Sequence, residues 1–310
     1  MHAAAIAPSA DVPLLDRGDV TARIRRTFTA PGYRPPMLPA VAVEVLNLAQ
    51  RVDVEFDQVV GVLEKDPVLA AKVLSISQSA AYASRSAILS LRVAVVRLGL
   101  KTIRDIVLEA ALHLKVFRVP GYEPALGRLA RHSTAAAHLT RAVCRRTRVE
   151  SEYAFLCGLL HDVGYAAALL ALADDPELRR APFTALAPVL DDVHDEASGL
   201  LARLWKLPEP VQRVVASHHD LPERPEPVSA ALVVAEQLAW EAGAGMEPPP
   251  PGASPMSLET PEPPLDGIDV NWTGLVEQAR RALGMDDLAM GAARAEAFQI
   301  VAQLAGPATR

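Results

Sequence analysis

Several kinds of residue are scarce in this sequence, and each scarcity excludes a class of protein. Cys144 and Cys157 are the only cysteines among 310 residues, and both lie in apolar helical sequence. Two such cysteines do not make a disulfide framework, so we expect reduced core residues. Aromatic residues make up only 5% of the chain. Because Ala and Leu dominate instead, the composition favours helices over strands.

Long apolar runs and targeting signals are also lacking. The longest apolar run, 163–173, is shorter than the ~20 residues that a membrane helix needs. The first residues, Met1-His-Ala-Ala-Ala-Ile, have neither the basic region nor the continuous apolar stretch of a signal peptide. We therefore expect a cytoplasmic protein without membrane insertion. The net charge of −6 argues against a protein that coats nucleic acid.

Familiar catalytic motifs are missing as well: the sequence has no Walker-type glycine loop, no serine-centred nucleophile elbow and no CxxC pair. Helical periodicity is present almost throughout. Asp66-Pro67 predicts a helix with proline in its first turn. The stretch 86–112 is predicted to be helical with an interruption at Gly99. Its basic residues, Arg92 to Arg104, indicate a solvated helix face or, alternatively, a helix-turn-helix.

We predict an all-α protein with an N-terminal helical subdomain packed on a second helical core. Breaks at proline- and glycine-rich positions suggest where its segments end. The predicted segments are an N-terminal tail and short helix (1–34), an N-terminal helical subdomain (35–120), a second helical subdomain (121–245), a proline-rich linker or insertion (246–265), and C-terminal helices that pack on the second subdomain (266–310).

The most informative stretch is an apolar helical run that ends in His161-Asp162. Two adjacent polar side chains need partners if they are buried. Helical spacing places further ligating side chains on or beside apolar faces, which suggests one shared polar centre. The same spacing assigns His138 to the solvent-facing side of its helix, and His113 is also expected at the surface. The candidate partners are His132, His194, His218, His219 and Glu236.

The polar residues belong to short motifs that follow one another in a distinctive order. The motifs are His132-Ser, Gly158-Leu-Leu-His-Asp-Val-Gly, His194-Asp-Glu-Ala-Ser-Gly, Trp205-Lys-Leu-Pro and His218-His219, with Leu38-Pro39, Asp66-Pro67 and Leu98-Gly-Leu in the N-terminal half. This order resembles that of the HDOD domain, the HD-related output domain of bacterial signalling proteins, and the similarity covers about residues 35 to 240. The resemblance implies a regulatory role through protein contacts, with cyclic-dinucleotide enzymes, kinases or receivers as partners.

HDOD domains are related to the HD and HD-GYP phosphohydrolases, and this relationship implies ligands for one or two Fe, Mn, Zn, Co or Ni ions. His132 resembles the first ligand and His161-Asp162 the signature pair, with Asp162 the catalytic residue of an enzyme. His194 and either His218 or His219 resemble the additional histidines. In a working site, His132, His161, Asp162 and Glu236 would hold one ion, and Asp162 would bridge to a second ion held by His194 and His218.

Two departures from the enzyme pattern weaken the catalytic interpretation. Tyr165 stands where the HD signature commonly has a phosphate-holding lysine, and Glu236 stands where an aspartate is usual. The leading hypothesis is therefore a non-catalytic signalling module. The alternatives are a metal-dependent phosphohydrolase acting on a nucleotide or cyclic dinucleotide, and a module that binds nucleic acid or a phosphorylated ligand through its basic helices. The cluster could also be held by hydrogen bonds and buried water, without an ion.

Overall fold

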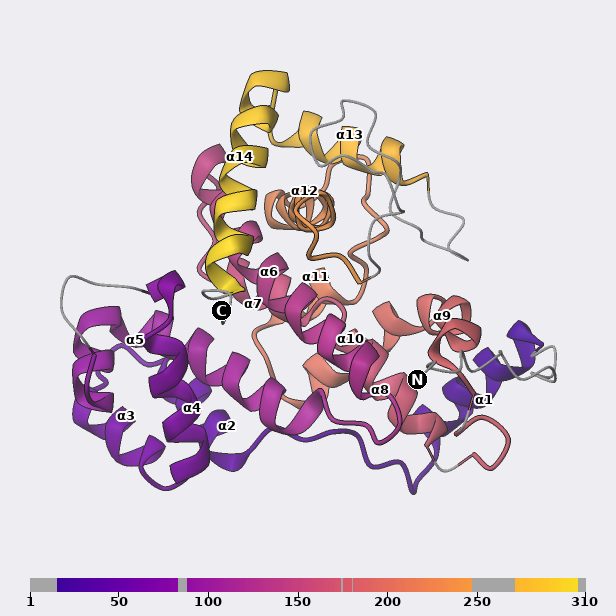
Figure 1. Cartoon of the computed structure of the whole chain (residues 1–310), viewed down its shortest axis with the longest axis horizontal. Helices are drawn as coiled ribbons and strands as arrows, with labels where there is room; N and C mark the ends of the chain where they lie inside the picture. Colours follow the sequence, from indigo (N-terminus) through magenta and orange to yellow (C-terminus); the bar gives the residue numbers. More distant parts are fainter. Residues whose placement is uncertain (1–15, 83–87, 174, 180, 247–270, 306–310) are drawn as a thin grey trace, which may run out of the picture.

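The computed structural model describes residues 16–82, 88–173, 175–179, 181–246 and 271–305, and within these ranges the chain is helical with no strand (Figure 1). The prediction of an all-α fold is confirmed. The predicted linker, 246–265, lies outside the described residues except for Met246. The helices are α1 Arg17–Thr29, α2 Ala40–Leu48, α3 Phe56–Leu63, α4 Pro67–Ser77, η1 Ala80–Tyr82, α5 Leu91–Ala111, η2 Leu112–Val116, α6 Glu123–Thr147, α7 Ala154–Leu160, α8 Gly164–Leu172, α9 Phe183–Asp191, α10 His194–Leu204, α11 Glu209–Val215, α12 Pro227–Glu241, α13 Trp272–Ala282 and α14 Asp287–Leu304.

Helices α2 to α5 pack on one another in the N-terminal half, at the lower left of Figure 1. Local capping explains where α4 begins. The Asp66 carboxylate accepts hydrogen bonds from the backbone N–H groups of Val68 and Leu69, at 3.2 and 3.0 Å, and Pro67 follows it in the first turn. The predicted interruption at Gly99 is also present, because this residue has φ 77° and ψ 164° inside α5.

The 25-residue helix α6 is the longest described helix, and α7 and α12 pack along it. Helix α10 packs on α8, α13 packs on α12, and α14 lies against both α12 and α6. The first helix packs mainly on elements far along the chain. Helix α1 lies against α8 and α9, on the right of Figure 1, and its Arg25 Nε donates to Glu196 of α10 at 2.9 Å.

The stretch Ala154–Leu172 is long and apolar enough to cross a membrane, but 89% of its most apolar window is buried inside the protein. It is also two helices rather than one, since α7 ends at Leu160 and α8 begins at Gly164. Burial among other helices is what a core segment shows. Cys144 and Cys157 are both buried and free.

The prediction that His113 and His138 lie at the surface is wrong. His138 packs edge-on against Phe155, with ring centroids 5.2 Å apart, and the His113 Nε2 lies 3.4 Å from the Thr134 hydroxyl. The reason is that α6 is covered on more than one side. Its central alanines, 135–137, are at most 1% exposed, so they let other elements approach the face that periodicity assigned to solvent.

Candidate metal centre

Five helical segments bring the predicted ligands to one point in the interior. His132 lies within α6, His161-Asp162 follows α7, His194 begins α10, His218-His219 follows α11, and Glu236 lies within α12. All of these except His219 are at most 8% exposed, and His219 is partly buried. The structure therefore places every predicted ligand in or beside a single buried cluster.

Two glycines and a serine allow this convergence. A Cβ atom on Gly158 would lie 2.5 Å from the backbone oxygen of Ala136, so the absence of a side chain lets α7 approach α6. Gly164 has the same relationship to the backbone of His194 in α10. The Ser198 hydroxyl then joins the two segments, because it accepts from the Gly164 N–H at 2.8 Å and donates to the carbonyl of His161 at 2.5 Å.

The Asp162 carboxylate lies at the centre of the cluster. Its Oδ2 is 3.2 Å from the Nε2 of His161 and 3.4 Å from the Nε2 of His132. Its Oδ1 is 3.4 Å from the Nε2 of His218 and 3.5 Å from the Nε2 of His194. Each oxygen of one carboxylate thus faces a separate pair of imidazoles, which is the position of a ligand that can bridge two cations.

The imidazoles are held in one orientation by backbone carbonyls. A carbonyl oxygen only accepts hydrogen bonds, so the Nδ1 atom that faces it carries the proton and the Nε2 atom turns a lone pair toward the centre. This is the arrangement in which histidine binds a metal. The contacts are His132 Nδ1 with Ala244 at 3.0 Å, His161 Nδ1 with Gly158 at 2.9 Å, and His194 Nδ1 with Asp191 at 2.8 Å.

A third carboxylate, Asp195, belongs to the cluster and was missed by the sequence analysis. Its Oδ1 lies 2.9 Å from His194 Nε2, 3.1 Å from His218 Nδ1 and 3.6 Å from His219 Nδ1. The adjacent pair His194-Asp195 repeats the pattern of His161-Asp162, and this was the signal that could have identified it. Glu236 approaches from the other side, with its Oε2 3.4 Å from His219 Nε2.

Several polar atoms of the cluster are buried without a well-directed hydrogen bond. Such atoms cost free energy unless something satisfies them. The Oε1 of Glu236 has no hydrogen-bond partner. The Nε2 atoms of His194 and His218 and the Nδ1 of His219 lie 2.9 to 3.6 Å from carboxylate oxygens of Asp195 or Asp162, but these contacts lack hydrogen-bond geometry.

These residues fit a divalent metal. Three groups of potential ligands have their atoms within 4.8 Å of one another, and mixed imidazole and carboxylate donors suit Fe, Mn, Zn, Co and Ni. The sequence analysis placed Glu236 beside His132. In the structure, Glu236 groups with His161 and His218 instead. The groups are His132, His161 and Asp162; His161, His218 and Glu236; and His194, Asp195, His218 and His219.

The charges in the cluster also favour a cation. Burial by itself lowers the pKa of the His161 imidazole, but the nearby Asp162 and Glu236 carboxylates outweigh burial and raise this pKa to about 9. Burial also lowers the pKa of His194, but Asp195 and Asp162 outweigh it and raise this pKa to about 10. Burial disfavours the charged form of Asp162, but the surrounding histidines hold its pKa well below the usual range. The carboxylates therefore attract positive charge, which protons supply when no metal is bound.

Tyr165 occupies the place of the lysine that is common in HD enzymes. Its hydroxyl donates to Asp191 at 2.5 Å, and its ring stacks on His194 with centroids 4.5 Å apart. The side chain is 7% exposed. This position thus supplies a buried aromatic wall to the cluster instead of a cation for a phosphate.

Three basic residues of α5 are paired with acidic ones. Arg92 forms an ion pair with Asp57, and the Lys101 Nζ lies 2.7 Å from Glu152. Arg104, which was predicted on an exposed face, is 3% exposed and pairs with Asp105 at 2.8 Å. These pairs reduce the positive potential that α5 offers to a nucleic-acid backbone.

Comparison with known proteins agrees with this arrangement. The family model for the HDOD domain matches residues 36–221. This chain belongs to the HDOD domain family. The HDOD chain described here also matches a curated, uncharacterised protein of Treponema pallidum, with 28% identity over 200 residues, or 62% of this chain. The chain spans 39% of the length of that relative.

Three solved structures show the same fold. One is an HDOD domain protein of unknown function from Geobacter sulfurreducens, with a TM-score of 0.65 and 23% identity over 94% of this chain and 99% of that one. Another, from Shewanella amazonensis SB2B, is provisionally named a metal-dependent phosphohydrolase, with a TM-score of 0.68 and 18% identity over 93% of this chain and 98% of that one. The third, from Marinobacter aquaeolei VT8, is provisionally named a signal transduction protein, with a TM-score of 0.61 and 21% identity over 96% of this chain and 67% of that one.

Proposed function

We propose that this chain is a regulatory HDOD module that acts through contacts with signalling proteins and whose buried cluster binds one or two divalent metal ions. The observation that carries the metal-binding part is the position of Asp162, with each carboxylate oxygen facing two imidazole Nε2 atoms. Membership of the HDOD family and the signalling name of the Marinobacter structure support the regulatory part.

A structural and regulatory role for the ion follows from where its ligands come from. The residues that would hold it are supplied by α6, α12 and the ends of α7, α10 and α11. An ion held by such separate segments stabilises their arrangement, since binding to the folded state alone adds to the free energy of unfolding. Partner contacts on any of these helices would then depend on the metal.

Catalysis is the second candidate, and one observation favours it. A carboxylate that faces two histidine pairs can be shared by two ions, and a bound pair would polarise a phosphoryl oxygen and activate water for hydrolysis. The side chain of Asp195 is the most exposed carboxylate of the cluster, at 29%, so a substrate would approach beside it. The tyrosine at position 165 argues against this candidate because it brings no charge to hold a phosphate.

Metal analysis tests the proposal directly. Protein purified without chelator, and chelated protein titrated with Mn, Fe, Zn or Ni, should hold one or two ions per chain. The double variant His161→Ala, Asp162→Ala should lose at least one of these ions while keeping its helical content, because the two residues belong to two of the three ligand groups. If the native chain binds none of these metals, the metal-binding function is wrong.

The same samples separate regulation from catalysis. We expect the loaded chain to unfold at a higher temperature than the chelated chain and to leave phosphodiesters, including cyclic dinucleotides, uncleaved. Metal-dependent cleavage that is lost on Asp162→Asn would establish the second candidate instead. Metal-dependent binding of a kinase, receiver or cyclase would support the first.

A further inference from the structure

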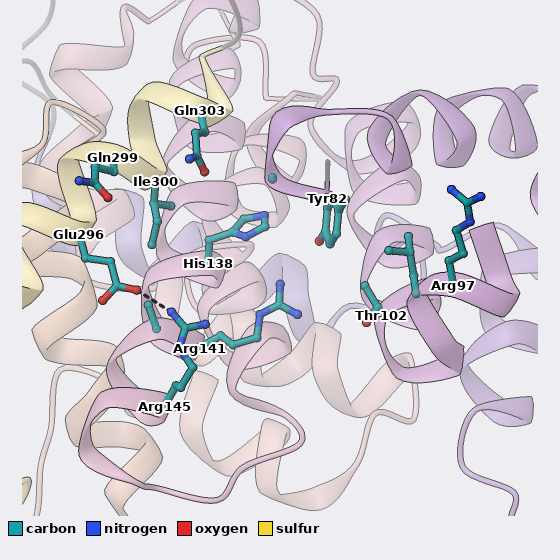
Figure 2. Close-up of a pocket in the computed structure, with 13 residues that line it drawn as sticks. Tyr82, Arg97, Thr102, His138, Arg141, Arg145, Glu296, Gln299, Ile300 and Gln303 are labelled. Carbon is teal, nitrogen blue, oxygen red and sulfur yellow. Dashed lines mark hydrogen bonds and ion pairs between the residues drawn. The ribbon is translucent and has the colours of Figure 1, made fainter. Parts of the chain in front are cut away.

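A second site lies outside the metal centre, where the N-terminal half meets α6 and α14. A cavity of about 650 Å³ opens there, between η1 and α5 on one side and α14 on the other (Figure 2). This volume is in the range of small-molecule sites. None of the predicted metal ligands lines it, so a ligand bound there would act independently of the metal.

The cavity wall is positively charged. Arg97 contributes from α5, Arg141 and Arg145 contribute from α6, and Glu296 is the one carboxylate among the lining residues. The Arg141 Nη1 also lies 3.5 Å from the buried Asp105 behind the wall. The wall itself still carries more guanidinium than carboxylate groups, which favours an anion, and the planar guanidinium matches a phosphate in shape. Glu296 is shared, because both Arg145 and Arg146 donate to it, at 2.5 and 2.6 Å. A phosphate that displaces Arg145 would therefore leave Glu296 paired with Arg146.

His138 gives the cavity a polar atom that needs a partner. Its Nε2 is buried and has no hydrogen-bond partner. Burial lowers the pKa of this imidazole to about 3, and Arg141 adds to the effect, so the ring is neutral and offers a hydrogen bond rather than charge. Figure 2 shows the ring in the space between α14 and Tyr82, and the His138 and Tyr82 centroids are 5.6 Å apart. A buried polar atom without a partner indicates that something outside the chain completes it.

The remaining walls suit a flat heterocycle. Tyr82 and His138 present aromatic rings tilted by 58° to each other. Across the cavity, Gln299 and Gln303 lie one helical turn apart on α14 and both belong to its lining, and the Gln303 side chain points toward His138 in Figure 2. Each amide group both donates and accepts hydrogen bonds, as recognition of the edge of a base requires.

We propose that this cavity binds a 5′-mononucleotide, with its phosphate on Arg145 and Arg141 and its base between the aromatic wall and the α14 amides. Phosphate alone would use the arginines but not the rings, and a nucleoside would use the rings but not the arginines. Binding would join α5, α6 and α14, which all contribute residues to the cavity wall.

Isothermal titration calorimetry of the full chain tests this proposal, with AMP, GMP, inorganic phosphate and adenosine as probes and a chelator present throughout. At least one of the two mononucleotides should bind more tightly than either phosphate or adenosine. Arg145→Ala should weaken that binding by roughly tenfold or more, because it removes a charged hydrogen bond. Arg131→Ala is the matched control, since it removes the same charge from an exposed position of α6 outside the cavity.

A second variant keeps the test independent of Arg145. Gln299 is exposed on α14, so the Gln299→Ala chain should fold normally and still bind the mononucleotide more weakly than the native chain does. Absence of binding by both mononucleotides would overturn the proposal, as would equal affinity for phosphate alone. Binding that survives Arg145→Ala but is lost in His161→Ala, Asp162→Ala would place the ligand at the metal centre and overturn it as well.

Discussion

His132 and His161 face each other through their Nε2 atoms at 3.1 Å, although the Nδ1 atom of each is hydrogen-bonded to a backbone carbonyl. Two lone pairs at this distance repel unless a proton or a cation lies between them. Because the pKa of His161 is raised to about 9, its imidazole carries that proton at neutral pH when no metal is bound. Metal binding at this centre is therefore an exchange of an ion for protons.

Metal affinity should accordingly rise with pH. The pKa values of His161 and His194, about 9 and about 10, mean that both imidazoles are protonated at neutral pH in the metal-free chain. Each must lose its proton to bind an ion, so affinity should increase about tenfold per pH unit for each displaced proton up to about pH 9. Calorimetry in two buffers of different ionisation enthalpy measures the protons released. Binding without proton release would contradict this interpretation.

Removing one ligand should remove the stabilisation that the metal provides. With an ion at a concentration of about 100 times its Kd, the native chain should gain about 2.7 kcal/mol in free energy of unfolding. His161→Ala deletes a fully buried imidazole of the centre and should lose most of this gain. His113→Ala is the matched control, because His113 is also a largely buried histidine but bonds Thr134 instead. Urea unfolding with metal and with chelator measures both. Equal metal stabilisation of the two variants would argue against the assigned ligands.

The sequence was sufficient to predict the convergence of His132, His161 and Asp162, because each lies on an apolar helical face and such faces pack together. It was not sufficient for Asp195, because this residue lies beside the apolar stripe of α10 rather than on it. Asp195 contacts the cluster because it lies in the first turn of α10, next to His194. The burial of His138 also escaped prediction. Helical periodicity identifies one apolar face, whereas α6 packs on several sides because its central residues are small. Such tertiary coverage depends on other helices, so a single helix pattern does not contain it.

Glu109 should limit stability at higher pH. The carboxyl group is 6% exposed and its Oε2 has no hydrogen-bond partner, and burial raises its pKa to about 7. A carboxyl whose folded pKa exceeds its unfolded value favours folding below that pKa and opposes it as pH rises. Glu109→Gln should therefore stabilise the chain by about 1–3 kcal/mol above pH 7 and have little effect near pH 5. Urea unfolding at both pH values measures the difference.

The control for Glu109 is Asp105, another buried carboxylate on α5. Burial raises the pKa of Asp105 to about 6, less far than that of Glu109, because Arg104 at 2.8 Å partly offsets it. Asp105→Asn would therefore remove a smaller penalty and leave a buried guanidinium without its partner. This variant should lose stability at pH 8, where Glu109→Gln gains it. If both variants changed the free energy of unfolding in the same direction at pH 8, the ion pair of Asp105 would not be what separates its effect on stability from that of Glu109.

The contact between α6 and α7 at Gly158 should be indispensable for the metal centre. A Cβ atom at this position would lie 2.5 Å from the backbone oxygen of Ala136 and 2.7 Å from the Cα of Ala137, and backbone atoms cannot move aside as a side chain does. Gly158→Ala should therefore cost about 3 kcal/mol or more of the free energy of unfolding and weaken metal binding, because His161 is hydrogen-bonded to the carbonyl of Gly158.

Gly291→Ala is the matched control on α14: a Cβ there meets nothing within 4 Å, so this helical substitution should stabilise by up to about 1 kcal/mol. Thermal unfolding and metal titration of both variants test the contact, and a Gly158→Ala chain that keeps native stability and affinity would show that α6 and α7 need not approach so closely.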